Sequence, residues 1–126
     1  MPTPPPICAL GGTMVPRMDP DVPEIDVDEL ARARAAGAAL VDVREPDEYE
    51  AVHVPGAQLI PLGEVAERLN EVPETEGPLY VICAKGGRSY RAAEFYRSQG
   101  IDAVNVAGGT TAWVEAGHPL ATGMEP

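Results

Sequence analysis

Cys83 and the loop that follows it show the clearest potential for chemistry in this sequence. The loop reads Cys-Ala-Lys-Gly-Gly-Arg over residues 83–88, between an apolar run typical of a buried strand and a stretch typical of a helix. Gly86 and Gly87 permit positive φ angles, so several backbone N–H groups can converge on one anion, and the helix adds its positive N-terminal end. A helix N-terminus and nearby Lys or Arg lower the pKa of a cysteine, so the pattern predicts a nucleophilic thiolate at Cys83.

The distribution of charge favours the same location. Residues 83–99 carry four basic side chains and one acidic side chain, whereas the rest of the chain carries five basic and nineteen acidic side chains. A positive pocket in an acidic protein favours a small anionic substrate over an extended polyanion. The simpler alternative, in which Cys83 is only a small buried side chain at a strand end, leaves the glycine pair and the cations unexplained.

The composition excludes several other classes of protein. The 126 residues have a net charge of -11, which disfavours nucleic-acid binding because phosphate contacts need a clustered basic surface. Two cysteines, Cys8 and Cys83, and two histidines, His53 and His118, are too few for a disulfide framework or a structural zinc site. No apolar run approaches the ~20 residues of a membrane span, so we expect no membrane partner and a cytoplasmic, reducing location.

The proline content divides the chain into two parts. Seven of the 14 prolines lie in residues 1–24, which show no helical or strand periodicity, so we expect a flexible, proline-rich N-terminal arm there. Residues 25–126 suffice for one domain and leave no room for a second. Cys8 lies on the arm, 17 residues before the expected fold, and is either an incidental exposed thiol or a partner that reaches Cys83.

The expected domain alternates short apolar runs with helical stretches. We expect strands over residues 38–43, 58–60, 79–83 and 103–107, and helices over 29–36 with Asp28 as the cap, from Pro46 onward, and over 63–70, 89–99 and 110–116. This alternation predicts an α/β fold with a mainly parallel central sheet of about five strands and helices on both faces. Ligands bind such sheets beyond the carboxyl ends of the strands, where the Cys83 loop would lie.

Three segments of the sequence carry recognisable motifs. They are residues 42–49 with 53–57, which read DVREPDEY and HVPGA; residues 83–89, which read CAKGGRS; and Gly108-Gly109 with Trp113, Gly117 and Pro119. Together, in this order and at compatible spacings, they resemble the single-domain rhodanese-type sulfurtransferases over most of residues 25–121. The first segment departs from the family at Val52, where a glycine often precedes the histidine.

The resemblance implies a two-step transfer of sulfur that needs no metal or organic cofactor. The Cys83 thiolate would take the outer sulfur of a small anionic donor such as thiosulfate, and sulfite would leave. A thiol, cyanide or a protein thiol would then remove the sulfur from the Cys83 persulfide. The resemblance assigns the substrate-binding loop to Ala84, Lys85, Gly86, Gly87, Arg88 and Ser89.

Several other side chains receive supporting roles. Lys85 would attract the anionic donor, while Arg88 would either brace the loop or add to its positive field. We expect Asp42 to brace the loop through hydrogen bonds rather than to carry a proton. Arg44 would either face the mouth of the pocket or pair with an acidic neighbour. The resemblance places His53 in a structural turn, and a catalytic role is disfavoured because a thiolate nucleophile needs no base to activate it.

Two other functions fit parts of the pattern. Cysteine phosphatases and arsenate reductases also use a thiolate in an anion-binding loop that ends in arginine, but their loops are longer than the four residues, 84–87, that separate Cys83 from Arg88 here. The loop also offers no acid to protonate a leaving alcohol. The second alternative is a persulfide carrier or binding module for a dedicated partner protein, which is chemically continuous with the enzyme and stays open.

Overall fold

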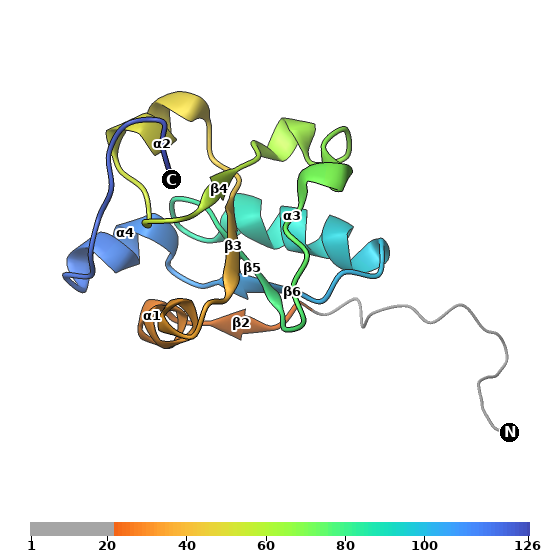
Figure 1. Ribbon diagram of the computed structural model, residues 1–126, viewed down its shortest axis with the longest axis horizontal. Coiled ribbons are helices and arrows are strands. Elements are labelled where there is room, and N and C mark those ends of the chain that lie inside the picture. The colour runs from red at the N-terminus through yellow and green to blue at the C-terminus, as the bar shows by residue number, and fades with distance from the viewer. Residues whose placement is uncertain (1–21) are drawn as a thin grey trace, which may run out of the picture.

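A five-stranded parallel sheet organises residues 22–126, the part of the chain that the computed structural model describes (Figure 1). In spatial order the strands are β2 (Glu24–Ile25), β6 (Ala103–Val106), β5 (Leu79–Ile82), β3 (Ala39–Asp42) and β4 (Gln58–Leu59). Every neighbouring pair is parallel, and the central Val81 lies between Val41 and Asn105. The predicted α/β fold with a mainly parallel sheet is confirmed.

Strand β2 is the one strand of the described sheet that the sequence did not reveal. Glu24 pairs with Asn105 and Ile25 with Val106, and Val22 just before them is already buried. A strand of two residues offers no alternation of apolar and polar side chains to detect. Residues 1–21 lie outside the described residues, so most of the predicted arm, including Cys8, stays a prediction.

Helices and short turns connect the strands of the described chain. They are α1 (Val27–Ala35), α2 (Pro46–Ala51), α3 (Gly87–Ser98) and α4 (Gly109–Glu115), with 3₁₀ turns η1 (Leu62–Glu64) and η2 (Leu69–Glu71). Asp26, not Asp28, caps α1, because Glu29 N donates to its carboxylate at 2.8 Å and the Glu29 carboxylate accepts from Asp26 N at 3.0 Å. This reciprocal capping box begins the helix two residues before the predicted start.

The prediction of a helix over residues 63–70 is wrong, because the structure has only the 3₁₀ turns η1 and η2 in this region. A segment this short forms a stable α-helix only where tertiary packing supports it. Val65 is its only buried residue, so such packing is largely missing. Arg68 instead pairs with Glu64 at 3.0 Å and Glu71 at 2.8 Å and closes the segment on itself.

Two apolar clusters, one on each face of the sheet, form the core. Neighbouring strand residues such as Leu40 and Val41 belong to different clusters, as the pleat of a strand requires. The first cluster contains Leu30 of α1, Tyr49 of α2, Leu40, Ile82, Val106 and Trp113 of α4; the second contains Val41, Val81, Ala103 and, from α3, Ala92, Ala93 and Tyr96. The predicted placement of helices on both faces is confirmed (Figure 1).

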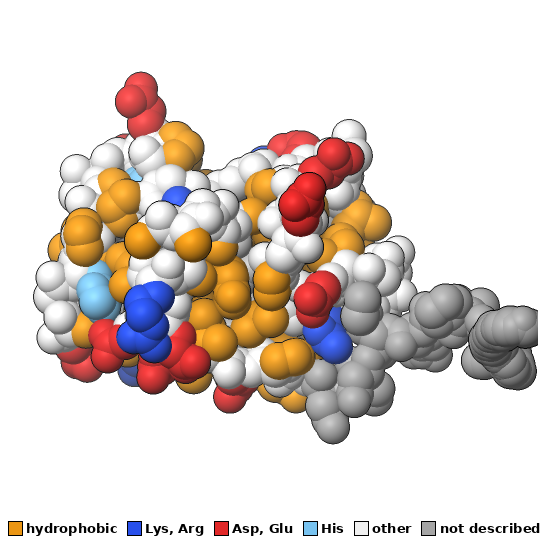
Figure 2. All heavy atoms as spheres, turned by 60° about the horizontal axis from the view of Figure 1, so that its bottom comes forward, with side chains coloured by type: hydrophobic (Ala, Val, Ile, Leu, Met, Phe, Trp, Pro, Cys, Tyr) orange, Lys and Arg blue, Asp and Glu red, His pale blue; other side chains and the backbone are white. Residues whose placement is uncertain are grey.

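The surface reflects the acidic composition. Figure 2 shows one face, on which acidic side chains occur in several separate groups and the larger basic groups lie beside acidic ones. Among the described residues, no helix is long and apolar enough to cross a membrane.

Candidate active site

Cys83 directly follows β5 at the carboxyl edge of the sheet, and its side chain turns inward. The residue is 1% exposed, and its Sγ accepts a hydrogen bond from Gly86 N at 3.0 Å. The Ser89 hydroxyl lies 3.3 Å from the same sulfur. Gly86 caps α3 with φ +112, a left-handed conformation that L side chains rarely adopt, and this conformation directs its N–H back toward Cys83.

The surroundings of Cys83 favour the ionised thiol. Burial alone raises the pKa of Cys83, but the Ser89 hydroxyl and the backbone N–H groups of Ser89, Gly86 and Lys85 outweigh it, so the pKa lies below its ordinary value. The groups that stabilise the thiolate are therefore mostly neutral dipoles of the loop and the first turn of α3. This is the anion cradle that the glycine pair predicts.

The beginning of α4 fixes the other side of the loop. Thr110 N donates to Cys83 O at 2.8 Å and Thr111 N donates to Ala84 O at 3.0 Å. Gly109, which begins α4 with φ +59, lies so close that a Cβ there would be 2.3 Å from Cys83 O. The sequence predicts a turn at this glycine pair but not its contact with the Cys83 loop, since the two segments are far apart in the chain.

Asn105 and Glu24 complete a polar network behind Ser89 that sequence reasoning missed. Asn105 Oδ1 lies 2.5 Å from Ser89 Oγ, and Asn105 Nδ2 donates to Gly86 O at 3.2 Å and to Glu24 Oε2 at 2.7 Å. Asn105 is buried in the middle of β6. A signal was available, because asparagine is an unusual residue in a short apolar strand and a buried amide needs hydrogen-bond partners.

Arg88 is bound to α2 rather than free to face the pocket. Its two terminal nitrogens donate to the two carboxylate oxygens of Glu48 at 2.7 and 2.9 Å. The hydrogen bond from Arg88 lowers the pKa of Glu48 to about 2. Of the two roles that the sequence leaves open for Arg88, this geometry favours bracing. Lys85 is exposed at the loop mouth and pairs with no acidic side chain among residues 22–126.

Asp42 and Arg44 form a buried ion pair at the end of β3. Arg44 Nη2 donates to Asp42 Oδ2 at 2.9 Å and to Val52 O at 2.6 Å, and Arg44 N donates to Asp42 Oδ1 at 3.0 Å. Arg44 thus pairs with an acidic neighbour, and it also lines a hollow of about 340 Å³ together with Ala84 of the loop. The side-chain hydrogen bonds of Asp42 run to Arg44, so any bracing of the loop by the Asp42 carboxylate is indirect.

His53 occupies a structural position. Its ring nitrogens lie 2.8 Å from Tyr49 O and 2.9 Å from Glu125 O, and its ring stacks on that of Tyr49 with centroids 3.7 Å apart. The backbone of His53 also bridges to Ala121, so the turn holds the C-terminal segment. These contacts occupy the imidazole away from the Cys83 loop.

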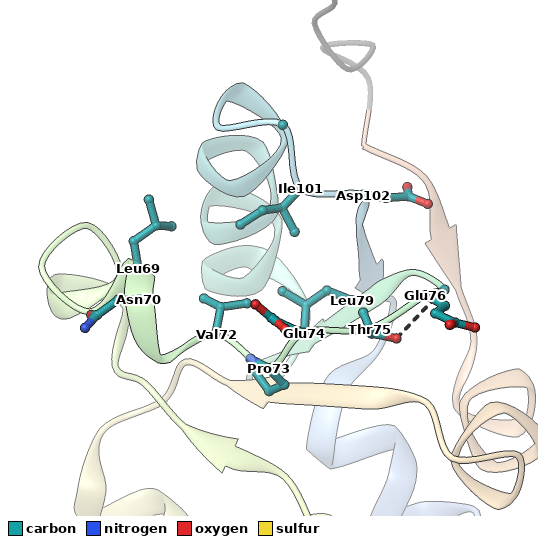
Figure 3. Close-up of a pocket in the computed structure, with 12 residues that line it drawn as sticks. Leu69, Asn70, Val72, Pro73, Glu74, Thr75, Glu76, Leu79, Ile101 and Asp102 are labelled. Carbon is teal, nitrogen blue, oxygen red and sulfur yellow. Dashed lines mark hydrogen bonds between the residues drawn. The ribbon is translucent and has the colours of Figure 1, made fainter.

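A larger hollow of about 700 Å³ lies at the opposite end of the sheet (Figure 3). Leu79, which begins β5, lines it, whereas Cys83 lies beyond the end of that strand. Its rim carries the carboxylates of Glu74, Glu76 and Asp102. No group of His, Cys, Asp and Glu within residues 22–126 is arranged to hold a metal ion, and no cysteine, histidine or basic side chain lines this hollow, so its size alone does not make it the reactive site.

Known proteins provide a comparison with both the sequence and the fold. The rhodanese-like domain matches residues 26–116. A sulfurtransferase of Allochromatium vinosum is 33% identical over 102 residues, which cover 79% of this chain and 94% of that protein. The candidate sulfur carrier protein YrkF of Bacillus subtilis is 41% identical over 95 residues, 73% of this chain but 51% of that protein, so the chain spans about half of this relative.

Solved structures agree with this result. The crystal structure of a rhodanese-related protein from Thermoplasma volcanium is 32% identical and has a TM-score of 0.73, with 82% of this chain and 99% of that chain covered. The matched region contains β3, β5, β6 and the Cys83 loop. The sequence, the parallel sheet and the relatives together place this chain in the rhodanese-like domain family of sulfurtransferases and sulfur carriers.

Proposed function

We propose that this protein is a sulfurtransferase in which Cys83 takes a sulfane sulfur from a small anionic donor such as thiosulfate and passes it to a thiol-type acceptor. The observation that carries the proposal is the cradle around Cys83 Sγ, with Gly86 N at 3.0 Å and the Ser89 hydroxyl at 3.3 Å. A thiolate held by neutral dipoles is a nucleophile that needs no general base. The similarity to the A. vinosum sulfurtransferase, which this chain covers almost in full, supports the same activity.

In the first step the Cys83 thiolate attacks the outer sulfur of thiosulfate. A bond forms between Sγ and that sulfur, the S–S bond of thiosulfate breaks, and the electron pair of that bond leaves on sulfite. The total charge is unchanged, because the negative charge of the thiolate reappears on the terminal sulfur of the persulfide. The loop N–H groups stabilise this charge without the reorganisation that solvent would need.

In the second step a thiolate or cyanide attacks the terminal sulfur of the persulfide. The new bond forms to the acceptor, the bond between the two sulfurs breaks, and its electron pair returns to Cys83 Sγ. The enzyme is then as it began, so transfer follows ping-pong kinetics. Gly87 leaves the mouth of the loop open, since a Cβ built there meets no atom within 4 Å.

Lys85 supplies the attraction for an anionic donor. It is exposed at the loop mouth, whereas the charge of Arg88 is compensated by Glu48. Replacing Lys85 with Gln is expected to slow sulfur loading by about threefold at low salt and by less at high salt, because exposed charges are screened. Arg91→Gln is the matched control: it removes the same charge from an exposed position on α3 and should affect loading less.

A sulfur carrier that serves a dedicated partner protein is the second candidate function. The similarity to YrkF favours it, although this chain spans about half of that protein. Both candidates share the Cys83 persulfide and differ in how the sulfur leaves. A carrier would keep its sulfur in the presence of cyanide or small thiols and release it to a protein acceptor.

Mass spectrometry of the intact protein after incubation with thiosulfate tests the proposal. We expect one added sulfur on wild-type protein, none on Cys83→Ser, and loss of the added sulfur after cyanide or a small thiol is supplied. An added sulfur that only a partner protein removes would favour the carrier. Hydrolysis of an aryl phosphate without any sulfur adduct would overturn both and favour the phosphatase reading.

A further inference from the structure

The Ser89 hydroxyl stands between two acceptors and has one proton to donate. Its Oγ lies 3.3 Å from Cys83 Sγ and 2.5 Å from Asn105 Oδ1. A serine hydroxyl donates one hydrogen bond and accepts up to two, so it cannot donate to both atoms at once. Ser89 is 0% exposed and Asn105 is 1% exposed, so bulk water cannot replace a partner that is lost.

The orientation of the Asn105 amide is fixed by its other contacts. Its Nδ2 donates to Glu24 Oε2 at 2.7 Å and to Gly86 O at 3.2 Å. Carbonyl and carboxylate oxygens only accept, so a flipped amide would place its own oxygen against them. Asn105 Oδ1 must therefore face Ser89 as an acceptor.

We propose that Asn105, oriented by Glu24, competes with Cys83 for the hydrogen bond that the Ser89 hydroxyl donates and so controls how much of Cys83 is thiolate. When Cys83 is protonated, its S–H donates to Ser89 Oγ and the Ser89 hydroxyl donates to Asn105 Oδ1. When Cys83 is a thiolate, the Ser89 hydroxyl donates its hydrogen bond to the charged sulfur, and Asn105 Oδ1 loses its donor. Asn105 is thus a positioning residue that opposes ionisation of Cys83, whereas the backbone cradle favours it.

The competition has a consequence for the sulfur-loaded protein, and this consequence alone rests on the proposed function. Once Cys83 carries a second sulfur, the negative charge lies on the terminal sulfur, and Sγ becomes neutral. The Ser89 hydroxyl can then donate its hydrogen bond to Asn105 Oδ1 again. Asn105 would therefore stabilise the loaded form relative to the empty thiolate.

The other charged groups near Cys83 belong to separate elements, and all of them except Glu24 are held by contacts that do not involve Asn105. They are Lys85 in the loop, Arg88 at the start of α3 with its partner Glu48 in α2, the Asp42–Arg44 pair after β3, and Glu24 in β2 behind Asn105. A change in the acidity of Cys83 on mutation of Asn105 alone can therefore be attributed to the local network.

The pH dependence of Cys83 alkylation by iodoacetamide, with wild type and Asn105→Leu, tests the proposal. Leucine keeps the approximate size but removes Oδ1, so Ser89 is free to donate to the thiolate, and the pKa of Cys83 should fall by about one unit, as expected for one buried hydrogen bond. A thiolate of lower pKa is also less nucleophilic, so alkylation should be about threefold faster well below both pKa values and about threefold slower well above them.

The sign of the shift separates this role from a merely structural one. If Asn105 only held Gly86 O in place, its loss would loosen the cradle and raise the pKa of Cys83. Ser89→Ala provides a second criterion, because it removes the link from Asn105 to the sulfur through the hydroxyl and leaves the one through Gly86. In that background Asn105→Leu should no longer lower the pKa of Cys83, and a fall that persists without the Ser89 hydroxyl would overturn the proposal.

Glu24→Gln keeps the proposal testable even if Asn105→Leu unfolds. Glu24 is exposed, and glutamine can still accept from Asn105 Nδ2 while it no longer polarises the amide through its charge. We expect a smaller fall in the pKa of Cys83 that exceeds the fall caused by Glu24→Gln in a Ser89→Ala background, where only the direct loss of charge acts. Equal falls in the two backgrounds, no change, or a rise would contradict the proposal. Alkylation needs no sulfur donor, so this inference and the proposed function can fail separately.

Discussion

Replacing Gly109 with alanine is expected to displace the Cys83 loop from its active position. Gly109 has φ +59, and a Cβ there would lie 2.3 Å from Cys83 O and 2.6 Å from the carbonyl carbon and oxygen of Ala84. Ordinary van der Waals contact begins near 3.4 Å, and the opposing atoms are backbone atoms that cannot rotate away. The loop and the start of α4 must therefore separate by about 1 Å.

The size of the effect follows from the contacts that this separation disturbs. A non-glycine residue in the left-handed region costs about 1–2 kcal/mol. The separation also weakens the hydrogen bonds from Thr110 N to Cys83 O and from Thr111 N to Ala84 O, worth about 1 kcal/mol each. We expect the free energy of unfolding to fall by about 3–4 kcal/mol. A misplacement of this size also costs about 100-fold in rate, so sulfur loading should slow accordingly.

Gly117→Ala is the matched control for this substitution. Gly117 follows the other end of α4 with φ +80, and a Cβ there would meet nothing within 4 Å. It carries the same kind of backbone penalty, about 1–2 kcal/mol, but not the contact with the loop. Urea unfolding and the rate of sulfur loading from thiosulfate measure both effects. If the two variants lose equal stability and load sulfur equally fast, the close approach at Gly109 does not position Cys83.

Three further predictions concern residues around the site and in the core. Asp42→Asn breaks the buried pair with Arg44 and should cost about 3–5 kcal/mol in urea unfolding, and a cost below about 1 kcal/mol would contradict the buried pairing. Glu48→Gln should cost less than about 1 kcal/mol at neutral pH, because the pair with Arg88 is partly exposed. The pKa of Glu48 falls from 4.5 in the unfolded chain to about 2 in the folded protein. The stability difference between wild type and Glu48→Gln should therefore be full above pH 4.5 and vanish as the pH falls through about 2. A stability difference that persists below pH 2 would refute this assignment. The Tyr96 hydroxyl is buried without a hydrogen-bond partner among the described residues, so Tyr96→Phe should raise the free energy of unfolding by about 1 kcal/mol, whereas a loss of stability would show that the hydroxyl is satisfied.

The sequence was most informative where a local pattern has a direct physical meaning. The apolar run before Cys83 and the glycines after it predict a strand, a turn and a helix, and β5, the positive φ of Gly86 and α3 follow that order. Pro46 likewise begins α2 as predicted. The expected parallel sheet follows from the alternation of such units.

The sequence was least informative about contacts between distant segments. Neither the support of the loop by Gly109 nor the link from Asn105 to Glu24 across neighbouring strands leaves a local pattern. The choice between Glu48 and the pocket for Arg88 also depends on how α2 and α3 are placed, because they pack on opposite faces of the sheet and meet through this ion pair. The helix expected over residues 63–70 failed for the related reason that packing, not propensity, decides the fate of short helices.

The stoichiometry of a single turnover shows whether Cys83 itself carries the transferred sulfur. Wild-type protein would be mixed with excess thiosulfate, and sulfite release would be measured together with the sulfur bound to Cys83 by mass spectrometry. We expect one sulfite released for each sulfur added to Cys83, and neither product with Cys83→Ser. Sulfite release without a persulfide, or no reaction although Cys83 alkylates as a low-pKa thiolate, would contradict it.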